Sequence, residues 1–457
     1  MMKIDALIAE IGSTTTVVNA FDQLDSHPVF IGQGMAPTSI LQGDVRIGLK
    51  QAMTNLEEQI KVQIEPKLTL ASSSAAGGLK MSVHGLVYDM TVKAAKEAAL
   101  GAGANIKLIT AGLLTDADLE RIKETPLNIM MVAGGVDYGD SAISLANAGK
   151  LASLQLSIPI IYAGNIVNHQ AVQDVFTRYQ QTEYLFITEN VYPRIDEINI
   201  EPVRKIIHQV FENHIVHAPG MEGIRALIHQ NIIPTPGAVY ELCLLLQKKL
   251  GNLVCVDVGG ATTDVFSIGE ETHPETNISI TPEPFAKRTV EGDLGVYINR
   301  YHLAEQIGYP QLEKELGISR SYLEALLRDY QAIPPALQLP LTRRLAKEAL
   351  AIALKRHAGT IHHHYLATGK VKVIEGKDLS EFPHILATGG ALTRLPDGKA
   401  IIKECLEAAD PKSLKPSPGA HIWLDHHYIA ASLGVLAKVH PQAAVKLILE
   451  SMNKKEE

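Results

Sequence analysis

The stretch that decides the fold occurs twice. Residues 6–21 read ALIAEIGSTTTVVNAF, and residues 253–268 read LVCVDVGGATTDVFSI. In each copy an apolar run ends in an acid, Glu10 or Asp257, and a turn rich in Gly, Ser and Thr leads into a second apolar run. Two apolar runs joined by such a turn are typical of a β-hairpin. Because the copies share one register, 247 positions apart (257 − 10), they indicate a duplicated fold.

The turns of both hairpins carry the chemistry of phosphate binding. Gly lets a ligand approach the backbone closely, and a turn of this kind points several N–H groups the same way. A carboxylate beside phosphate is favourable only with a hard cation between them, so Glu10 and Asp257 predict Mg²⁺ held through water. One such hairpin has an equally good structural explanation, but two in register favour a nucleotide clamp. The predicted nucleotide-binding residues are Gly12, Ser13, Thr14, Thr15, Gly259, Gly260, Thr262 and Thr263, and the predicted catalytic residues are Glu10, Asp257 and Asp264.

A third motif follows later in the chain. Residues 383–396 read PHILATGGALTRLP, a strand that ends in two glycines before a helix start. Paired glycines let a backbone lie against a flat group such as adenine or ribose, which makes Gly389, Gly390 and Ala391 candidates for adenosine contact. By itself the motif would be an ordinary strand, turn and helix. Its position after the two hairpins favours nucleotide binding.

Two segments rich in small residues predict a close helix pair. Gly237 and Ala238 open one helix, and residues 425–437, DHHYIAASLGVLA, supply the small residues of the other, Ala430, Ala431, Gly434 and Ala437. Small side chains let helix axes approach closely and slide. Ordinary tight packing is the alternative interpretation.

Short β-rich runs that alternate with helical patterns predict an α/β protein. Buried-looking strands within 103–197 end in small residues and are spaced by helix-length connections, which predicts an inserted domain with a parallel sheet. The remainder divides into two related domains. We expect the first at 1–102 with 198–250 and 425–457, and the second at 251–424.

Composition narrows the possible partners. The formal charge is −8 and aromatic residues make up only 5%, which argues against nucleic acid as a partner. No apolar run reaches the roughly 20 residues of a membrane span, and the first residues lack a signal-peptide layout. The three cysteines are far apart in sequence, as expected for reduced thiols of a cytoplasmic protein.

Several other polar residues leave alternatives open. Glu291 and Asp293 either face the metal from the second domain or lie in a solvated loop. Arg356 either flanks adenosine or makes a surface salt bridge. His362–His364 lie in a run expected to be helical, where consecutive side chains do not converge on one ion, so a zinc site is not predicted.

The hairpins, the glycine motif and the helix pair, in this order, resemble the actin-like ATPase superfamily. The corresponding segments are a first phosphate hairpin at 10–16, a hinge helix near 234–246, a second phosphate hairpin at 257–264, an adenosine motif at 386–392 and a second hinge helix at 425–437. The resemblance implies two actin-like (ribonuclease-H-like) domains closing on Mg²⁺ and ATP or ADP.

Five further stretches resemble the MutL (or GlmL) family of accessory proteins to adenosylcobalamin-dependent glutamate mutase. They are LASSSAAGGLKMSVHGLV (70–87), IPIIYAGN (158–165), NVYPRIDEINIEPVR (190–204), IVHAPGM (215–221) and RTVEGDLG (288–295). The resemblance implies a cytoplasmic chaperone that uses ATP to exchange damaged for intact cobalamin in a mutase. The chain has no Asp-x-His-x-x-Gly cobalamin-ligand motif, so we expect it to act on the cobalamin enzyme without binding cobalamin itself.

Two departures from the superfamily pattern bear on the activity. The first acid is Glu10 where Asp is usual, and Ile233 stands before Pro234-Thr235 where the chaperone ATPases have Glu. Because Ile cannot polarise water, we expect slow ATP hydrolysis. The alternatives are a small-molecule kinase, although no convincing catalytic Asp occurs between residues 72 and 100, and a nucleotide-gated scaffold that does not hydrolyse ATP. The particular mutase, the oligomeric state (a homo-oligomer included) and any need for a small partner subunit stay open.

Overall fold

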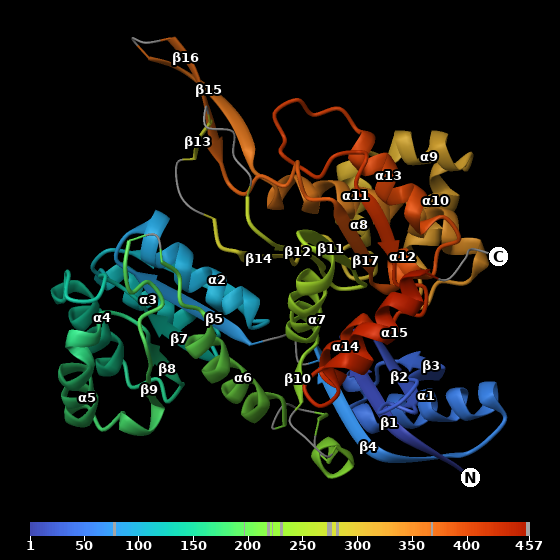
Figure 1. Ribbon diagram of the computed structural model, residues 1–457, viewed down its shortest axis with the longest axis horizontal. Coiled ribbons are helices and arrows are strands. Elements are labelled where there is room, and N and C mark those ends of the chain that lie inside the picture. The colour runs from blue at the N-terminus through green and yellow to red at the C-terminus, as the bar shows by residue number, and fades with distance from the viewer. Residues whose placement is uncertain are drawn as a thin grey trace. The chain divides into compact units, whose positions relative to one another are not determined.

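The computed structural model describes residues 1–75, 79–195, 197–216, 220–221, 223–228, 232–271, 277–279, 283–366 and 369–453. The chain forms two compact units (Figure 1). The larger unit consists of Met1–Ala75 with Pro219–Glu457, and the smaller unit is Ala76–Ala218.

The larger unit contains two five-stranded sheets of the same topology. The first sheet has the order β10 (Ile233–Pro234), β4 (Ile64–Ser73), β1 (Met2–Ile11), β2 (Thr15–Asp22) and β3 (Val29–Pro37). The second has the order β14 (Ala286–Glu291), β12 (Thr263–Ile268), β11 (Leu253–Val258), β17 (His384–Thr388) and β18 (His421–Leu424).

The two sheets correspond strand by strand. In the first, β1–β2 and β2–β3 are antiparallel, whereas β1–β4 and β4–β10 are parallel. In the second, β11–β12 and β12–β14 are antiparallel, whereas β11–β17 and β17–β18 are parallel. The predicted duplication is therefore confirmed, with β1, β2, β3, β4 and β10 matching β11, β12, β14, β17 and β18.

Three helices form a layer between the sheets (Figure 1): α7 (Thr235–Leu250), α14 (Ala430–Leu436) and α15 (Pro441–Asn453). This layer shares one apolar core with Ala6 and Ile8 of β1 on one side and with Leu253 and Cys255 of β11 on the other. Both hairpins are thus anchored to the same helices.

The predicted close helix pair is confirmed. Helices α7 and α14 pack directly on each other. At their crossing, a Cβ added to Gly434 would overlap the carbonyl oxygen of Ala238. Only glycine allows this approach of the two backbones.

Further helices cover the remaining faces. Helix α1 (Val45–Ile60) packs on β2 and β3. The second sheet is covered by α11 (Leu339–His357), around which lie α8 (Arg300–Ile307), α9 (Tyr309–Leu316), α10 (Arg320–Arg328), α12 (Gly390–Thr393) and α13 (Gly398–Glu407).

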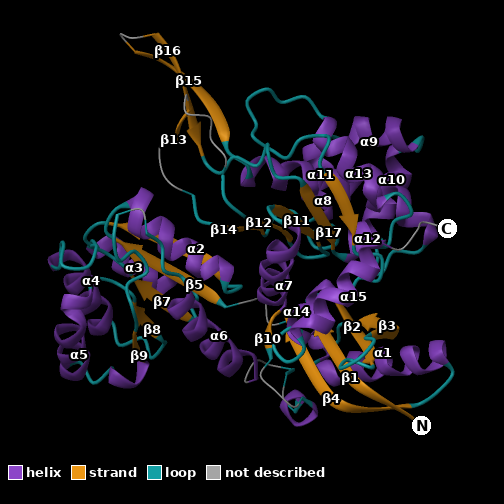
Figure 2. Ribbon diagram, in the orientation of Figure 1, coloured by secondary structure: helices purple, strands orange, loops and turns teal. Residues whose placement is uncertain are grey.

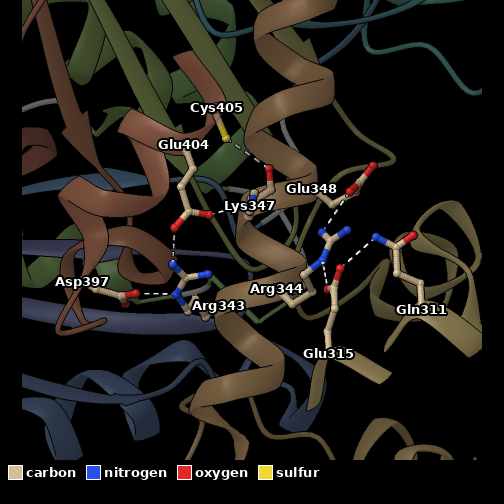
Figure 3. A network of polar contacts seen from close by, with 9 residues as sticks. All are labelled: Gln311, Glu315, Arg343, Arg344, Lys347, Glu348, Asp397, Glu404 and Cys405. Atoms are coloured by element: carbon tan, nitrogen blue, oxygen red, sulfur yellow. Dashed lines mark hydrogen bonds and ion pairs between the residues drawn. The ribbon is translucent and has the colours of Figure 1, made fainter. Parts of the chain in front are cut away.

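Figure 3 shows how polar contacts tie α11 to its neighbours. Arg343 pairs with Asp397 and Glu404 of the α13 region, and Arg344 pairs with Glu315 of α9 at 2.6 Å. Because these pairs are partly exposed, they orient the helices more than they stabilise them.

The smaller unit is a doubly wound parallel sheet (Figure 2). Its order is β6 (Asn105–Ala111), β5 (Lys80–Gly85), β7 (Ile129–Val132), β8 (Ile160–Tyr162) and β9 (Leu185–Ile187), with every pair parallel. The helices of the unit are α2 (Lys93–Gly101), α3 (Asp116–Glu124), α4 (Ala142–Ser153), α5 (His169–Arg178) and α6 (Glu201–Val216).

The prediction that the inserted segment forms a domain with a parallel sheet is confirmed. The compact unit is wider than the segment 103–197, because the central strand β5 precedes that segment and α6, which packs on α2, follows it. The division of the chain into domains at 1–102, 103–197, 198–250, 251–424 and 425–457 stays a prediction.

One sequence expectation is wrong. The histidine run lies in a strand, β15 (Thr360–Leu366), and not in a helix. β15 pairs with β16 (Gly369–Glu375), which pairs with β13 (Asn277–Ser279), and the three strands project from the second sheet's side of the larger unit (Figure 1). Cross-strand pairing decided this segment, since three consecutive histidines carry little helical preference.

Two further features concern the whole described chain. Among the described residues, no helix is long and apolar enough to cross a membrane. Cys243, Cys255 and Cys405 are free thiols and all are buried.

Candidate functional site

Strand alternation points Glu10 and Asp257 into the layer between the sheets. In β1, Ala6 and Ile8 face the α7–α14 layer, and Glu10 follows at the same period of two. In β11, Leu253 and Cys255 face that layer, and Asp257 follows. Both acids therefore sit at the inner ends of equivalent strands and face a common region.

Glu10 is a buried carboxylate with one unsatisfied oxygen. Its Oε1 accepts a hydrogen bond from the Tyr428 hydroxyl at 3.3 Å, and its Oε2 has no partner among the described residues. Burial, and then the charge of Asp257, raise the pKa of Glu10 to about 8. Burial and the charge of Asp264 raise the pKa of Asp257 to about 7. Two buried acids thus lie together, and their raised pKa values favour the protonated forms when no cation is bound.

Asp425 is a third acid of this region, which the sequence analysis did not select. It directly follows β18 and is fully buried. Its Oδ2 accepts hydrogen bonds from the backbone N–H groups of Ile429 and Ala430 at 2.8 Å each, and its Oδ1 accepts from the Ser451 hydroxyl at 2.8 Å. Burial raises its pKa. Asp425 therefore fixes α14 and α15 beside the two hairpin acids.

The topological repeat explains the location of Asp425. Glu10 lies beside Ser72 of β4, and Asp257 lies beside Thr388 of β17. The Thr388 hydroxyl donates to Asp425 at 3.1 Å. In the first sheet, the residue after the matching edge strand is Thr235, whose hydroxyl donates to Ser72 at 3.3 Å. At equivalent positions the first sheet thus carries the hydroxyl of Thr235 and the second sheet carries the carboxylate of Asp425. Because the two residue types differ, comparing the two copies in the sequence does not reveal that these positions correspond.

The two hairpin turns have the same backbone structure. The N–H group of Gly12 donates to the Thr15 carbonyl at 3.0 Å, and that of Gly259 donates to the Thr262 carbonyl at 3.0 Å. No described group accepts a hydrogen bond from the N–H groups of the next two residues, Ser13-Thr14 and Gly260-Ala261. Two turns with unused donors form a site suited to an anion.

The hydroxyl groups of the turns divide into two sets. Ser13 donates to the Ser74 carbonyl at 2.8 Å, Thr262 donates to Asp264 at 3.0 Å, and Thr263 donates to the Leu294 carbonyl at 2.8 Å. These three support the turns themselves. None of the described groups bonds the hydroxyls of Thr14 and Thr15, so these two remain available for a ligand.

The turns approach each other closely. A Cβ added to Gly260 would lie 2.8 Å from the Thr14 hydroxyl oxygen and 3.4 Å from the Thr14 Cβ. The loop that begins at Leu294 braces the second turn, because the N–H groups of Tyr297 and Ile298 both donate to the Gly260 carbonyl at 2.9 Å.

The glycine motif at 386–392 completes the site. Gly389 has φ = +89°, and a Cβ there would lie 2.5 Å from Asp257 Oδ1. Gly389 is thus required so that the turn can pass the second hairpin acid. Gly390 begins α12 in open space, and Ala391 is buried beneath it.

The remaining candidates lie in ion pairs. The Asp264 carboxylate is buried and pairs with Arg288 at 2.6 Å. Arg356 pairs with Glu291 at 2.6 Å and with Asp293 at 2.8 Å. Arg356 thus makes the ion pairs that were one of its two alternatives. Its partners are Glu291 and Asp293.

The first hinge segment has the predicted position. Ile233 and Pro234 form β10, which pairs with Ser72 and Ser73 of β4, and α7 begins at Thr235. Ile233 is half-buried.

The chemistry of the acids fits a magnesium ion held through water. Glu10 carries a buried oxygen without a hydrogen-bond donor, and burial raises the pKa values of both Glu10 and Asp257, so that a bound cation would favour their charged forms. Among the described residues, no three His, Cys, Asp or Glu side chains are close enough to bind a metal directly.

The duplicated sheets, their equivalent hairpins and the helix layer between them define the actin-like fold. The family model described as "MutL protein" matches residues 6–452, so the chain belongs to the MutL protein family. Protein MutL of Clostridium tetanomorphum is 35% identical over 458 residues, which cover 97% of this chain and 98% of that protein.

Two solved structures are similar at low identity. A nucleotide-free acetone carboxylase, titled for ATP-dependent acetone carboxylation, is 14% identical, with 95% of this chain and 70% of that chain covered and a TM-score of 0.39. A nucleotide-free diol dehydratase-reactivating factor is 11% identical, with 96% and 100% covered and a TM-score of 0.37.

Proposed function

We propose that the chain binds ATP and ADP with Mg²⁺ between its two hairpins. The main support for this proposal is that both turns carry unused N–H donors while buried acids follow the same strands, one of which, Glu10, has an oxygen without a partner. Donors alone would suit any anion, and acids alone would repel one. The combination favours a polyphosphate that arrives with a cation.

Different residues would contact different parts of the nucleotide. The turn amides with Thr14 and Thr15 would contact the phosphates, and Gly389 with Gly390 and Ala391 would pass beside the adenosine. Glu10 and Asp257 would hold Mg²⁺ through water, and the ion would neutralise phosphate charge. Asp425 positions α14 beneath these groups without contacting the ligand.

We expect slow ATP hydrolysis. Ile233 cannot polarise a water molecule, and the carboxylate of Asp264 is already paired with Arg288. Asp257 keeps the catalytic role proposed for it, and Asp264 contributes by orienting the second turn through Thr262. Slow turnover suits a switch that spends long periods in each nucleotide state.

We further propose that the switch serves an adenosylcobalamin-dependent mutase of the glutamate mutase type. Family membership supports an accessory role, in which ATP and ADP states differ in affinity for the mutase and damaged cobalamin is exchanged for intact cofactor. A tenfold difference in affinity needs only about 1.4 kcal/mol of coupling. The chain itself is proposed not to bind cobalamin.

Recovery of an inactivated mutase tests the function. Glutamate mutase whose cofactor has been damaged in place is mixed with the full chain, Mg–ATP and fresh adenosylcobalamin, and mutase activity is followed. We expect recovery that requires ATP, fails with Asp257→Asn and persists with the exposed control Glu407→Gln. ATP-independent recovery, or equal recovery with Asp257→Asn, would refute the nucleotide-driven mechanism.

A further inference from the structure

Exposed apolar residues of the smaller unit gather at one edge of its sheet. All five strands are parallel, so the loops after their carboxyl ends lie along the same edge. Among the described residues of this unit, the large hydrophobic side chains that are exposed are Val87 and Tyr88 after β5, Leu113 after β6, Tyr138 after β7, Ile166 and Val167 after β8, and Ile195 after β9.

This distribution differs from the scatter usual on protein surfaces. Single exposed apolar residues need no explanation. Here every strand contributes at least one, and all of them lie at the carboxyl edge, where α/β sheets bind their ligands. The arrangement marks this edge as a contact surface.

Tyr138 is held outward at the centre of that edge by a strained, well-braced loop. Its φ is +63°, a conformation that disfavours a bulky residue, yet its side chain is 83% exposed. The Asn165 side chain accepts from the Tyr138 N–H at 3.1 Å, and the Asn190 side chain donates to the Gly135 carbonyl at 3.0 Å. Backbone strain maintained at an exposed aromatic residue indicates function, since folding alone would favour Gly or Asn there.

The charge of the edge selects its partner. The segments that follow the strands, 86–92, 112–115, 133–141, 163–168 and 188–199, contain one basic residue, Arg194, which pairs with Glu197 at 3.7 Å. Asp89, Asp140 and Glu189 are exposed in the same segments. Apolar residues accompanied by exposed acids complement an apolar pocket flanked by basic side chains.

We propose that this carboxyl edge is the docking surface for a protein partner, with Tyr138 inserted into an apolar pocket that basic side chains surround. We assign the mutase as this partner, and the inference therefore rests on the proposed function. Tyrosine is among the residues that dominate binding energy at such centres.

Binding of purified glutamate mutase to the full chain, with and without Mg–ATP, tests the surface by surface plasmon resonance. We expect Tyr138→Asn to weaken binding at least tenfold, whereas the matched control Tyr322→Asn, on exposed α10 of the larger unit, changes it less than twofold. Asp89→Lys should slow association severalfold at low salt, with a smaller effect at high salt.

Thermal unfolding separates docking from a structural role. Asn accepts positive φ more readily than Tyr, so Tyr138→Asn should leave the melting temperature unchanged or raise it. A lower melting temperature would instead make Tyr138 a structural residue and overturn the proposal.

The remaining outcomes are also decisive. If Tyr138→Asn binds the mutase as tightly as the wild-type chain does, this edge is not the docking surface, and the proposed function is unaffected. If the wild-type chain does not bind the mutase in either nucleotide state, both the partner and the proposed function are wrong. Self-association lost in Tyr138→Asn, without mutase binding, would assign the edge to a second copy of the chain.

Discussion

Because Gly389 has no Cβ, the turn after β17 can pass directly beside Asp257 of the second hairpin. The residue combines φ = +89° with an approach that would place a Cβ 2.5 Å from Asp257 Oδ1. Its neighbour Gly390 has neither restriction, since a Cβ there meets no atom within 4 Å. The glycine pair therefore has one essential member and one replaceable member.

The two glycines therefore allow a matched pair of substitutions. Gly389→Ala should weaken Mg–ATP binding at least tenfold, because the new methyl group displaces Asp257 and the backbone conformation is strained. Gly390→Ala should stay within about threefold of wild type. Isothermal titration calorimetry with both variants checks this, and equal affinities would mean that Gly389 does not position the site.

At this scale the sequence predicted the repeated acids and turns but missed Asp425 and Tyr428. Glu10 and Asp257 were found because a repeat identifies equivalent positions without a structure. Asp425 has Thr235 as its counterpart, so the repeat offers no matching acid. Tyr428 reaches Glu10 across 418 positions, a contact that no local pattern encodes.

Among the elements, the crossing of α7 and α14 sets how closely the two sheets can share one core. Gly434→Ala should destabilise the larger unit by roughly 1–3 kcal/mol, because the added methyl group overlaps the Ala238 carbonyl. Gly149→Ala in α4, where a Cβ meets only Val175 at 3.7 Å, should stabilise by about 0.5–1 kcal/mol. Urea unfolding measures both, and a neutral Gly434→Ala would contradict the close crossing.

The sheet of the smaller unit predicts a pH dependence. His84 of β5 is fully buried between the hydroxyls of Ser82 and Thr110, each 2.9 Å away. Burial lowers its pKa from 6.5 to about 4. A depressed histidine pKa means that the unfolded chain binds the proton more readily. The stability contributed by neutral His84 is therefore fully present above pH 6.5 and is lost as the pH falls toward 4.

The size of this effect follows from the shift. Each pKa unit corresponds to about 1.4 kcal/mol, so the loss is on the order of 3 kcal/mol. Guanidinium unfolding between pH 4 and 7 should show a steeper decline for wild type than for His84→Gln. Taking the difference between the two proteins removes the contribution of other titrating groups. Parallel stability curves would show that His84 does not titrate in this way.

Elements were predictable where periodicity was strong. The hairpins and the parallel strands of the smaller unit follow directly from apolar patterns. The helix expected for the histidine run was wrong because the structure of that run depends on a partner outside it, the strand β16. The pairing of β5 with β6 and β7, which places β5 in the smaller unit, is likewise not encoded in the residues of β5 alone.

For the molecule as a whole, nucleotide binding at the proposed site requires the two hairpins to separate around the ligand. In this structure the turns are in contact at Thr14 and Gly260, and no room for phosphate lies between those two residues. Contact between the turns and nucleotide binding should therefore exclude each other. The separation of the two sheets is then what decides whether a nucleotide can bind.

A reversible cross-link between the turns tests this claim most directly. A Cβ at Gly260 would lie 3.4 Å from the Thr14 Cβ, close to the separation found in disulfides, so Thr14→Cys combined with Gly260→Cys should form one. The native cysteines are buried and should not interfere, and the single variant Thr14→Cys under oxidant is the control. We predict that the oxidised double variant loses Mg–ATP binding and regains it on reduction. Equal affinity in the oxidised and reduced states would show that the nucleotide does not bind between the hairpins.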